Sequence, residues 1–375
     1  EIPQIGWKKL SGVHGVANLF AKLKDYKLKS QPKFSISAGD LIAKGTFKYD
    51  FEAETLRQVV FEQFDSARSA FKGTLTNQNE KGWGAEISGE SFDLSKFWQD
   101  ILSDESEKEI HDIVLPDISI SMDIERMWLS EEKALSNFSG ELFHKGEVWR
   151  DVKLNAEIDK KTKLVFKIVS NKEKGRSLVI HSNNAGSILD FFELYENMRG
   201  GNLKIHGDYN DQIDGAPLEG TAVIDQFRVV NAPTLTHLLS ILSLTGIIEA
   251  LEGDGLAFQK LRMPFGFSKG VLNVSEARAS GPSLGFTATG QFHNHKKIVS
   301  LEGTMVPAYA LNSAFGHIPI VGDLLIGGEK GGGVFAANYN LNGLIDDPEV
   351  TVNPLSALTP GFLRKVFGIF EKKDK

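Results

Sequence analysis

The chain has 375 residues, of which 41% are hydrophobic, and this length is enough to bury a large core and to form two or three domains. Its 42 basic and 49 acidic residues give a net charge of −7, which argues against nucleic acid as a partner, because that binding needs clustered Lys and Arg. The chain contains no cysteine, which excludes disulfides, zinc–thiolate sites and cysteine nucleophiles.

The first predicted unit covers residues 1–112 and consists of strands followed by a short helix. Its first segment, Ile2–Leu28, has spaced apolar residues that predict either a short amphipathic helix or a loop. From Lys33 to Phe51 apolar and polar residues alternate, which predicts a half-buried strand. Asp93 is in a position to cap a helix that runs to Leu102. Further strands are expected at Val59–Phe64, Ser69–Thr76 and Trp83–Ile87.

The second predicted unit covers residues 113–200. Apolar residues occupy every second position of Ile118–Ile124, which predicts a strand with one buried face. A helix is expected at Gly186–Met198, where Gly200 and Gly201 follow and stop it. The alternating pattern returns in three more expected strands, Val152–Ile158, Leu164–Ile168 and Leu178–Ile180.

The third predicted unit, residues 201–375, is organised around one apolar helix at Leu235–Leu251. At about 1.5 Å per residue this helix would span about 26 Å, which is close to the thickness of a bilayer core. Polar residues such as His237 and Ser240 interrupt it, and the flanking strands need a cover for their apolar face. We therefore expect a lid on the sheet and not a transmembrane segment. Strands are expected at Leu203–Tyr209, Leu218–Val230, Leu256–Phe267, Val271–Ala279, Leu284–Phe292, Ile298–Val306 and Phe335–Ile345.

The last predicted element is a small amphipathic helix at Phe362–Phe370. Its mixture of apolar and basic residues suits contact with anionic lipid headgroups, and it also suits a cap on the last strands. Both interpretations stay open. The candidates for membrane contact are Phe362, Leu363, Arg364, Lys365, Phe367 and Phe370.

None of the catalytic patterns in the chain meets the requirements of its chemistry. Gly281–Gly285 has the spacing of a nucleophile elbow, but the sequence continues as a strand where a helix is needed. The glycines of Gly327–Gly333 lack the Lys-Ser or Lys-Thr of a phosphate-binding loop. His293 and His295 lie in a polar hairpin tip without a nearby carboxylate pattern. The sequence predicts a protein that is not an enzyme and that needs no metal or cofactor.

A set of motifs in the C-terminal half resembles a known family. The motifs are Asn231-Ala-Pro-Thr-Leu235, Leu238-Leu-Ser-Ile-Leu242, Gly255-Leu-Ala-Phe258, Gly281-Pro-Ser-Leu-Gly285, Gly303–Asn312, Ile318–Gly328 and Val352–Arg364. Together they resemble the C-terminal region of AsmA-like proteins, and most of all the YhdP-like branch found in the envelope of Gram-negative bacteria. The resemblance is dense from about Leu178 to Phe370 and thin before Pro116.

The resemblance implies a periplasmic protein, anchored to the inner membrane, with a long, curled antiparallel sheet whose concave side is apolar. Such proteins are associated with moving phospholipid toward the outer membrane. The family offers no motif of polar residues that could be transferred to this chain as a binding site. Because the sequence starts at Glu1 and has no run of about 20 apolar residues, we expect the anchor to lie outside it.

The residues themselves lead to the same class of fold, mainly β with a few amphipathic helices, as one continuous β architecture. Strands with one apolar face must cover it, since burial is worth about 25 cal/mol per Å². The predicted helices are too few to do so. Either a second sheet closes a sandwich, or lipid chains occupy an open groove.

We therefore expect a module that binds or conducts phospholipid along an apolar β groove between the two membranes. The alternative is an interaction scaffold that modulates outer-membrane protein or lipopolysaccharide assembly without carrying lipid. Phospholipid and a membrane surface are the expected partners, with envelope proteins as further partners. If the candidates face lipid, a change of one to Asp abolishes function without unfolding the protein. The groove candidates are Phe227, Phe258, Phe265, Phe267, Leu272, Val274, Leu284, Phe286, Phe292, Phe335, Tyr339 and Leu341.

Overall fold

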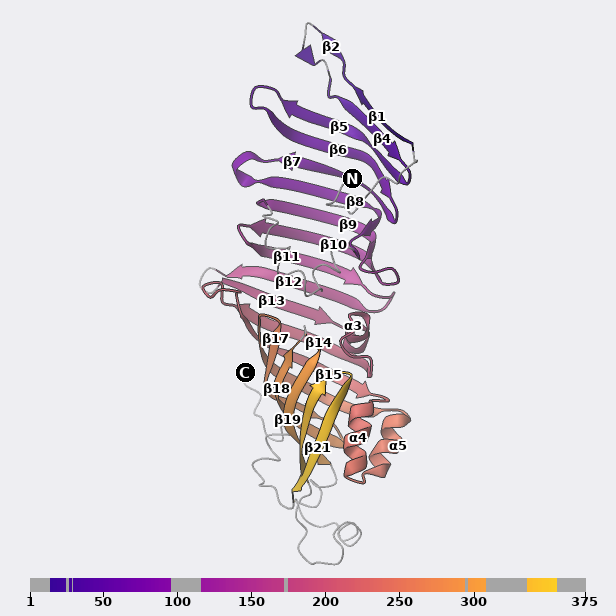
Figure 1. The fold of residues 1–375 in the computed structure, drawn as a ribbon, viewed down its shortest axis with the longest axis vertical. Helices are drawn as coiled ribbons and strands as arrows, with labels where there is room; N and C mark the ends of the chain where they lie inside the picture. The colour runs from indigo at the N-terminus through magenta and orange to yellow at the C-terminus, as the bar shows by residue number, and fades with distance from the viewer. Residues whose placement is uncertain are drawn as a thin grey trace, which may run out of the picture. The chain divides into compact units, whose positions relative to one another are not determined.

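The computed structural model of the chain describes residues 14–24, 27–28, 30–95, 116–171, 175–293, 296–307 and 336–355. In these residues the protein is mainly β, with one 19-stranded sheet that is not closed into a barrel and three short helices (Figure 1). The predicted fold class, mainly β with a long sheet and few helices, is confirmed. The chain divides into two compact units, residues 1–170 and residues 171–375, which we call unit 1 and unit 2 and describe separately.

Unit 1 is built from strands that pair with their neighbours in the chain. Their bounds are β1 (Gly15–Phe20), β4 (Lys33–Ala38), β5 (Leu41–Asp50), β6 (Thr55–Ser66), β7 (Ser69–Asn77), β8 (Trp83–Asp93), β9 (Ile118–Trp128), β10 (Ala134–Lys145), β11 (Val148–Glu157) and β12 (Lys163–Asn171). A separate two-stranded sheet contains β2 (Leu23–Lys24) and β3 (Lys27–Leu28), and a 3-10 turn, η2, covers Asn79–Lys81. The pairs described in unit 1 are antiparallel except β8 with β9, which are parallel.

The described residues of unit 2 form nine strands and the three helices. Their bounds are β13 (Gly175–Ser182), α3 (Ala185–Phe191), β14 (Met198–Tyr209), β15 (Leu218–Val229), α4 (Pro233–Ile241), α5 (Thr245–Glu252), β16 (Leu256–Ser268), β17 (Val271–Ser280), β18 (Leu284–His293), β19 (Ile298–Pro307), β20 (Ala336–Leu344) and β21 (Asp347–Leu355). The sheet of this unit curls, so that β17–β21 pass in front of β14–β16 (Figure 1). Helix α4 directly follows β15 and yet packs against β21, as this curl requires.

The structure corrects the prediction of a helix or a loop in Ile2–Leu28. Residues 1–13 lie outside the described residues, and Gly15–Phe20 is the strand β1. In the pairing of β1 with β4, Leu19 lies opposite Phe34. The side chain of Leu19 therefore extends the apolar face to which Phe34 belongs. The helix expected after Asp93 falls largely on residues 96–102, outside the described residues.

Two further helices are shorter than their patterns predicted. Helix α3 ends at Phe191, because the N–H groups of Leu194 and Tyr195 both donate to Leu189 O in a tight turn, and β14 begins at Met198. The apolar helix predicted at Leu235–Leu251 is two helices, α4 and α5, which are separated at Ser243 by a backbone φ of 56°. A φ in this region cannot continue an α-helix. Among the described residues no helix is long and apolar enough to cross a membrane.

Candidate functional site

One face of the sheet in unit 1 is apolar from strand to strand. Residues directly opposite one another in neighbouring strands share a face, and successive residues alternate between faces. The pairing of the strands therefore aligns one row of residues on this face, from β4 to β12. This row is Phe34, Gly45, Phe61, Gly73, Ile87, Met122, Gly140, Leu154 and Phe166.

Five phenylalanines on this face form a chain of ring contacts, which we call the Phe ladder: Phe34, Phe61, Phe64, Phe71 and Phe92. Their successive ring centroids are 5.7, 5.9, 4.6 and 5.3 Å apart. The described residues leave each of these rings half-buried. The Phe ladder is thus a partly open apolar surface that crosses β4, β6, β7 and β8.

The Phe ladder was not among the sequence-predicted groove residues, which all come from unit 2. A signal for it exists in the sequence, because Phe34, Phe61, Phe71 and Phe92 lie in strands whose apolar residues alternate with polar ones. Gly45 marks the same face, since a Cβ there would lie 1.8 Å from the carbonyl oxygen of Val60 and 3.0 Å from the ring of Phe34. The ring covers the glycine, a known device for protecting glycine in a sheet.

The predicted groove candidates of unit 2 share one face of that unit's sheet, as far as the structure describes them. For example, Phe265 lies opposite Val274, and Phe267 opposite Leu272. Phe335 lies outside the described residues. The structure therefore brings together the candidates Phe227, Phe258, Phe265, Phe267, Leu272, Val274, Leu284, Phe286, Phe292, Tyr339 and Leu341.

Burial divides these candidates into two groups. The buried group, with side chains at most 6% exposed, is Phe227, Phe258, Val274, Leu284 and Tyr339. The others are half-buried or, in Phe267, 42% exposed. The first group belongs to a packed core, and only the second group is accessible to a ligand.

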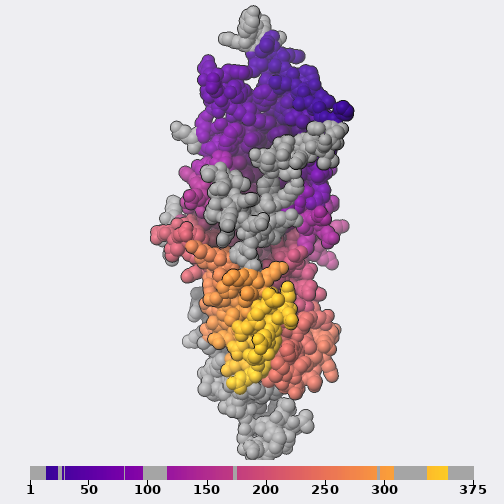
Figure 2. Space-filling model, in the orientation of Figure 1, coloured from indigo at the N-terminus to yellow at the C-terminus, as the bar shows by residue number. Residues whose placement is uncertain are grey.

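The packed core of unit 2 lies where the sheet meets its helices. Phe258 stacks on Phe227 at 5.1 Å and also contacts the ring of Phe286. The hydroxyl of Tyr339 donates to Thr287 O at 2.7 Å, and burial raises the pKa of Tyr339 above its usual value. Helix α5 packs against β16 and helix α4 against β21, and Figure 2 shows the last strands, in yellow, beside these helices. This end of the apolar face is therefore closed by the protein itself.

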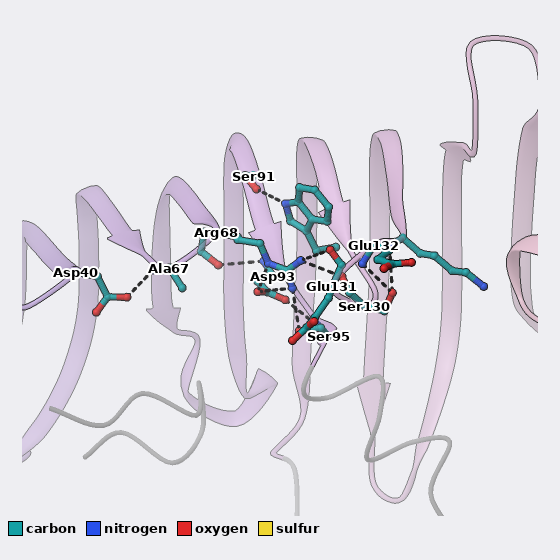
Figure 3. A network of polar contacts seen from close by, with 12 residues as sticks. Asp40, Ala67, Arg68, Ser91, Asp93, Ser95, Ser130, Glu131 and Glu132 are labelled. Carbon is teal, nitrogen blue, oxygen red and sulfur yellow. Dashed lines mark hydrogen bonds and ion pairs between the residues drawn. The ribbon is translucent and has the colours of Figure 1, made fainter. Parts of the chain in front are cut away.

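A polar network lies at one rim of unit 1, where successive turns meet (Figure 3). Arg68 donates to Asp93 Oδ2 at 2.9 Å and to the carbonyl oxygens of Ser130 and Glu131 at 3.0 Å. Its guanidinium also lies 4.6 Å from the ring centroid of Trp128. Arg68 thus ties the β6–β7 turn to the end of β8 and to the β9–β10 turn, across the parallel pair.

The carboxyl group of Asp93 is held in its ionised form by this network. Burial of Asp93 opposes ionisation, but the hydrogen bonds from Ser95 and Arg68 outweigh that effect and lower the pKa of Asp93. Because the folded-state pKa lies below the unfolded value, the stabilisation is present above the unfolded pKa and is lost as the pH falls through the folded one. The acid-sensitive window lies below the usual value of 3.8.

We expect Arg68→Ala to lower the free energy of unfolding by about 2 kcal/mol, because several charge-assisted hydrogen bonds are lost together. The variant should also lose part of the acid-dependent destabilisation that the lowered pKa of Asp93 predicts for the unchanged chain below pH 3.8. Urea unfolding at a series of pH values measures both effects. The control is Lys153→Ala, whose ion pair with Glu141 is exposed and should contribute less than about 1 kcal/mol. Equal losses in the two variants would contradict a stabilising role for this rim.

The remaining sequence-predicted sites have the following outcomes. The strand β18 begins at Leu284, directly after Ser283, which confirms that the Gly281–Gly285 pattern runs into a strand. His295, Gly327–Gly333 and the membrane-contact candidates Phe362–Phe370 lie outside the described residues. Within the described ranges no group of three His, Asp or Glu side chains could hold a metal ion.

Comparison with known proteins adds no family to these observations: no family model, curated protein or solved structure matches the chain.

Proposed function

We propose that this chain is a non-enzymatic module that binds or conducts phospholipid, with acyl chains lying along the apolar face of unit 1 and headgroups left in water. The observation that carries the proposal is the Phe ladder, a chain of aromatic rings that are each only half-buried. Exposed apolar patches of this kind mark binding surfaces in soluble proteins. Each acyl methylene buried on it would contribute about 0.8 kcal/mol.

The composition of the face supports lipid over a polar small molecule. The row that crosses it from Phe34 to Phe166 contains only apolar residues and glycine. An acyl chain needs no hydrogen bond, so such a lining suits it. A polar ligand would lose its hydrogen bonds to water without replacement.

The motif resemblance supplies the cellular setting of the proposal. We propose that the chain belongs with the YhdP-like branch of the AsmA-like proteins, in the periplasm of a Gram-negative bacterium. In that setting the phospholipid would pass between the inner and outer membranes. No cofactor is required.

An interaction scaffold is the second candidate, and the edge strand β1 favours it. Leu19 and Phe20 of β1 are 65% and 63% exposed. Among the described strands of the sheet β1 pairs only with β4, and an open apolar edge of this kind can accept a strand from another protein. A scaffold that modulates envelope assembly could bind its partner there without carrying lipid.

The lipid proposal is tested by Phe71→Asp, paired with the control Lys72→Asp. Phe71 belongs to the Phe ladder, whereas Lys72 is its exposed neighbour on the opposite face of β7. After mild purification of the full chain, we expect native mass spectrometry to detect bound phospholipid in the unchanged chain and in Lys72→Asp, and little or none in Phe71→Asp. A charge on this face removes acyl contact at a position where water can still solvate it.

Two results would count against lipid binding on this face. One is the absence of phospholipid from the unchanged chain under mild conditions, which would favour the scaffold. The other is equal lipid content in both variants. Circular dichroism must show that Phe71→Asp remains folded. If it unfolds, Ile87→Asn tests the same apolar face, on the neighbouring strand β8, with an uncharged side chain.

A further inference from the structure

A hollow of about 650 Å³ lies on the polar face of unit 1, opposite the Phe ladder. Its lining includes Thr74 and Thr76 of β7, whose neighbours in the strand, Gly73 and Leu75, belong to the apolar face. Residues from the six strands β6 to β11 line the hollow. Since neighbouring strands lie about 4.8 Å apart, the hollow extends for about 24 Å across the sheet.

The depth of the hollow comes from small side chains surrounded by longer ones. Ser119 and Ser121 lie near its centre, in the middle strand β9, whereas the side chain of Gln78 covers Gly84 of β8. Gln58 lies toward one end, and Phe143, directly across from Ser119, lies toward the other. The shape therefore suits an elongated ligand that lies flat across the strands.

The described residues of the lining combine four kinds of polar group, namely hydroxyl, amide, carboxylate and the ammonium of Lys153, with one aromatic ring. The side chains of Thr74, Glu86, Ser119 and Ser121 make no hydrogen bond to other residues that the structure describes. These groups can donate and accept hydrogen bonds without breaking internal ones. Phe143 is half-buried and is the aromatic residue of the lining.

This combination matches the chemistry of a sugar. A pyranose ring carries hydroxyl groups around its edge and apolar C–H groups on its faces, so it can hydrogen-bond to the polar side chains while one face packs on an aromatic ring. An extended hollow with several separate polar groups fits a chain of sugar units better than a single one. Its volume is also in the usual range for ligand sites, about 300–1,000 Å³.

The charge of the lining argues against anionic ligands. Glu86, Glu141 and Asp151 contribute three carboxylates against one ammonium group, that of Lys153, which pairs with Glu141 at 3.2 Å. Phosphate groups and nucleic acids would be repelled. An acyl chain would leave the polar lining unpaired, and a peptide strand would need the backbone groups of a sheet edge, which this face does not offer.

We propose that the polar face of unit 1 binds a neutral oligosaccharide in this hollow, with Phe143 packing on a sugar ring and Glu86, Ser119 and Ser121 bonding to its hydroxyl groups. The site lies on the opposite face from the Phe ladder and does not depend on the lipid function. A protein with both sites would hold a glycan on one face of its sheet and an apolar ligand on the other.

Saturation-transfer NMR on the full chain tests this site, with maltohexaose and chitohexaose as separate neutral probes. We expect transfer to the protons of at least one probe. Phe143→Ala should weaken the affinity for that probe about tenfold, because the packing surface for the sugar ring is lost. Asn155→Ala is the matched control, since Asn155 is exposed on the same face of β11 as Lys153 but lies outside the hollow.

A second variant guards against a folding defect in Phe143→Ala. Ser121 is exposed at the centre of the hollow, so Ser121→Trp should fill the hollow and abolish the transfer while the sheet stays folded. Phe71→Asp should leave sugar binding unchanged, which separates this site from the lipid proposal. No transfer to either probe, or equal transfer in the unchanged chain, Phe143→Ala and Ser121→Trp, would overturn the proposal.

Discussion

Replacing Leu239 with Asp is expected to lower the free energy of unfolding by more than about 4 kcal/mol and to abolish the folded state of unit 2. Leu239 is fully buried, at 0% exposure, in helix α4. The substitution removes a buried aliphatic side chain, which alone costs about 2–5 kcal/mol, and it introduces a charge without a partner. Urea unfolding followed by circular dichroism measures the loss.

Ile241→Asp is the matched control for this experiment, because Ile241 lies in the same helix but is 46% exposed. Its effect should stay within about 0.5 kcal/mol. Similar losses in both variants would mean that α4 is buried on all sides, as the long apolar pattern alone suggests. A small loss in both would mean that α4 does not pack against the sheet.

Most strands could be predicted from the sequence where the period of two is unbroken, although Lys33–Phe51, predicted as one strand, is β4 and β5 with a turn at Gly39 and Asp40. Strand β10 was missed, and the reason is local. Asn137 has a φ of 49°, and the pairing with β11 shifts between Ser136 and Ser139. Leu135 is buried before this irregularity and Phe138 after it, three residues later. The side chains that face the core therefore change from odd-numbered to even-numbered positions inside the strand. A pattern that changes parity does not stand out as a strand.

The direction of pairing could not be predicted from alternation. Strands β8 and β9 are parallel, with Ile87 opposite Met122, and their apolar faces match as they would in an antiparallel pair. Which residues share a face follows from the sequence, whereas direction depends on the path of the chain between the strands. The split of Leu235–Leu251 into α4 and α5 was hidden for a similar reason, because both helices are apolar and no Gly or Pro marks Ser243.

The groove candidates show the same limit at the level of the site. Alternation and register place Phe265 and Phe267 opposite Val274 and Leu272. Phe258 has the opposite parity within the same strand and joins the other candidates through its ring contact with Phe286. The accessibility of the candidates does not follow from alternation, because burial depends on which distant elements cover each part of the sheet. Phe258 and Phe267 lie in the same strand, yet one is 4% and the other 42% exposed. The half-buried Phe ladder therefore fits lipid contact better than Phe258 or Tyr339.

Phe258→Ala is accordingly expected to destabilise the protein by about 3–5 kcal/mol, the usual cost of removing a buried phenylalanine. The ring stacks on Phe227 at 5.1 Å with an interplanar angle of 10°, so the variant would leave a cavity beside a second ring. The control, Phe267→Ala on the same strand, should lose less than about 1 kcal/mol, because its side chain already contacts solvent. Thermal and urea unfolding compare the two. If Phe258→Ala instead keeps its stability and loses bound phospholipid, the face of unit 2 around Phe258 is open to ligand and the lipid site extends beyond the Phe ladder.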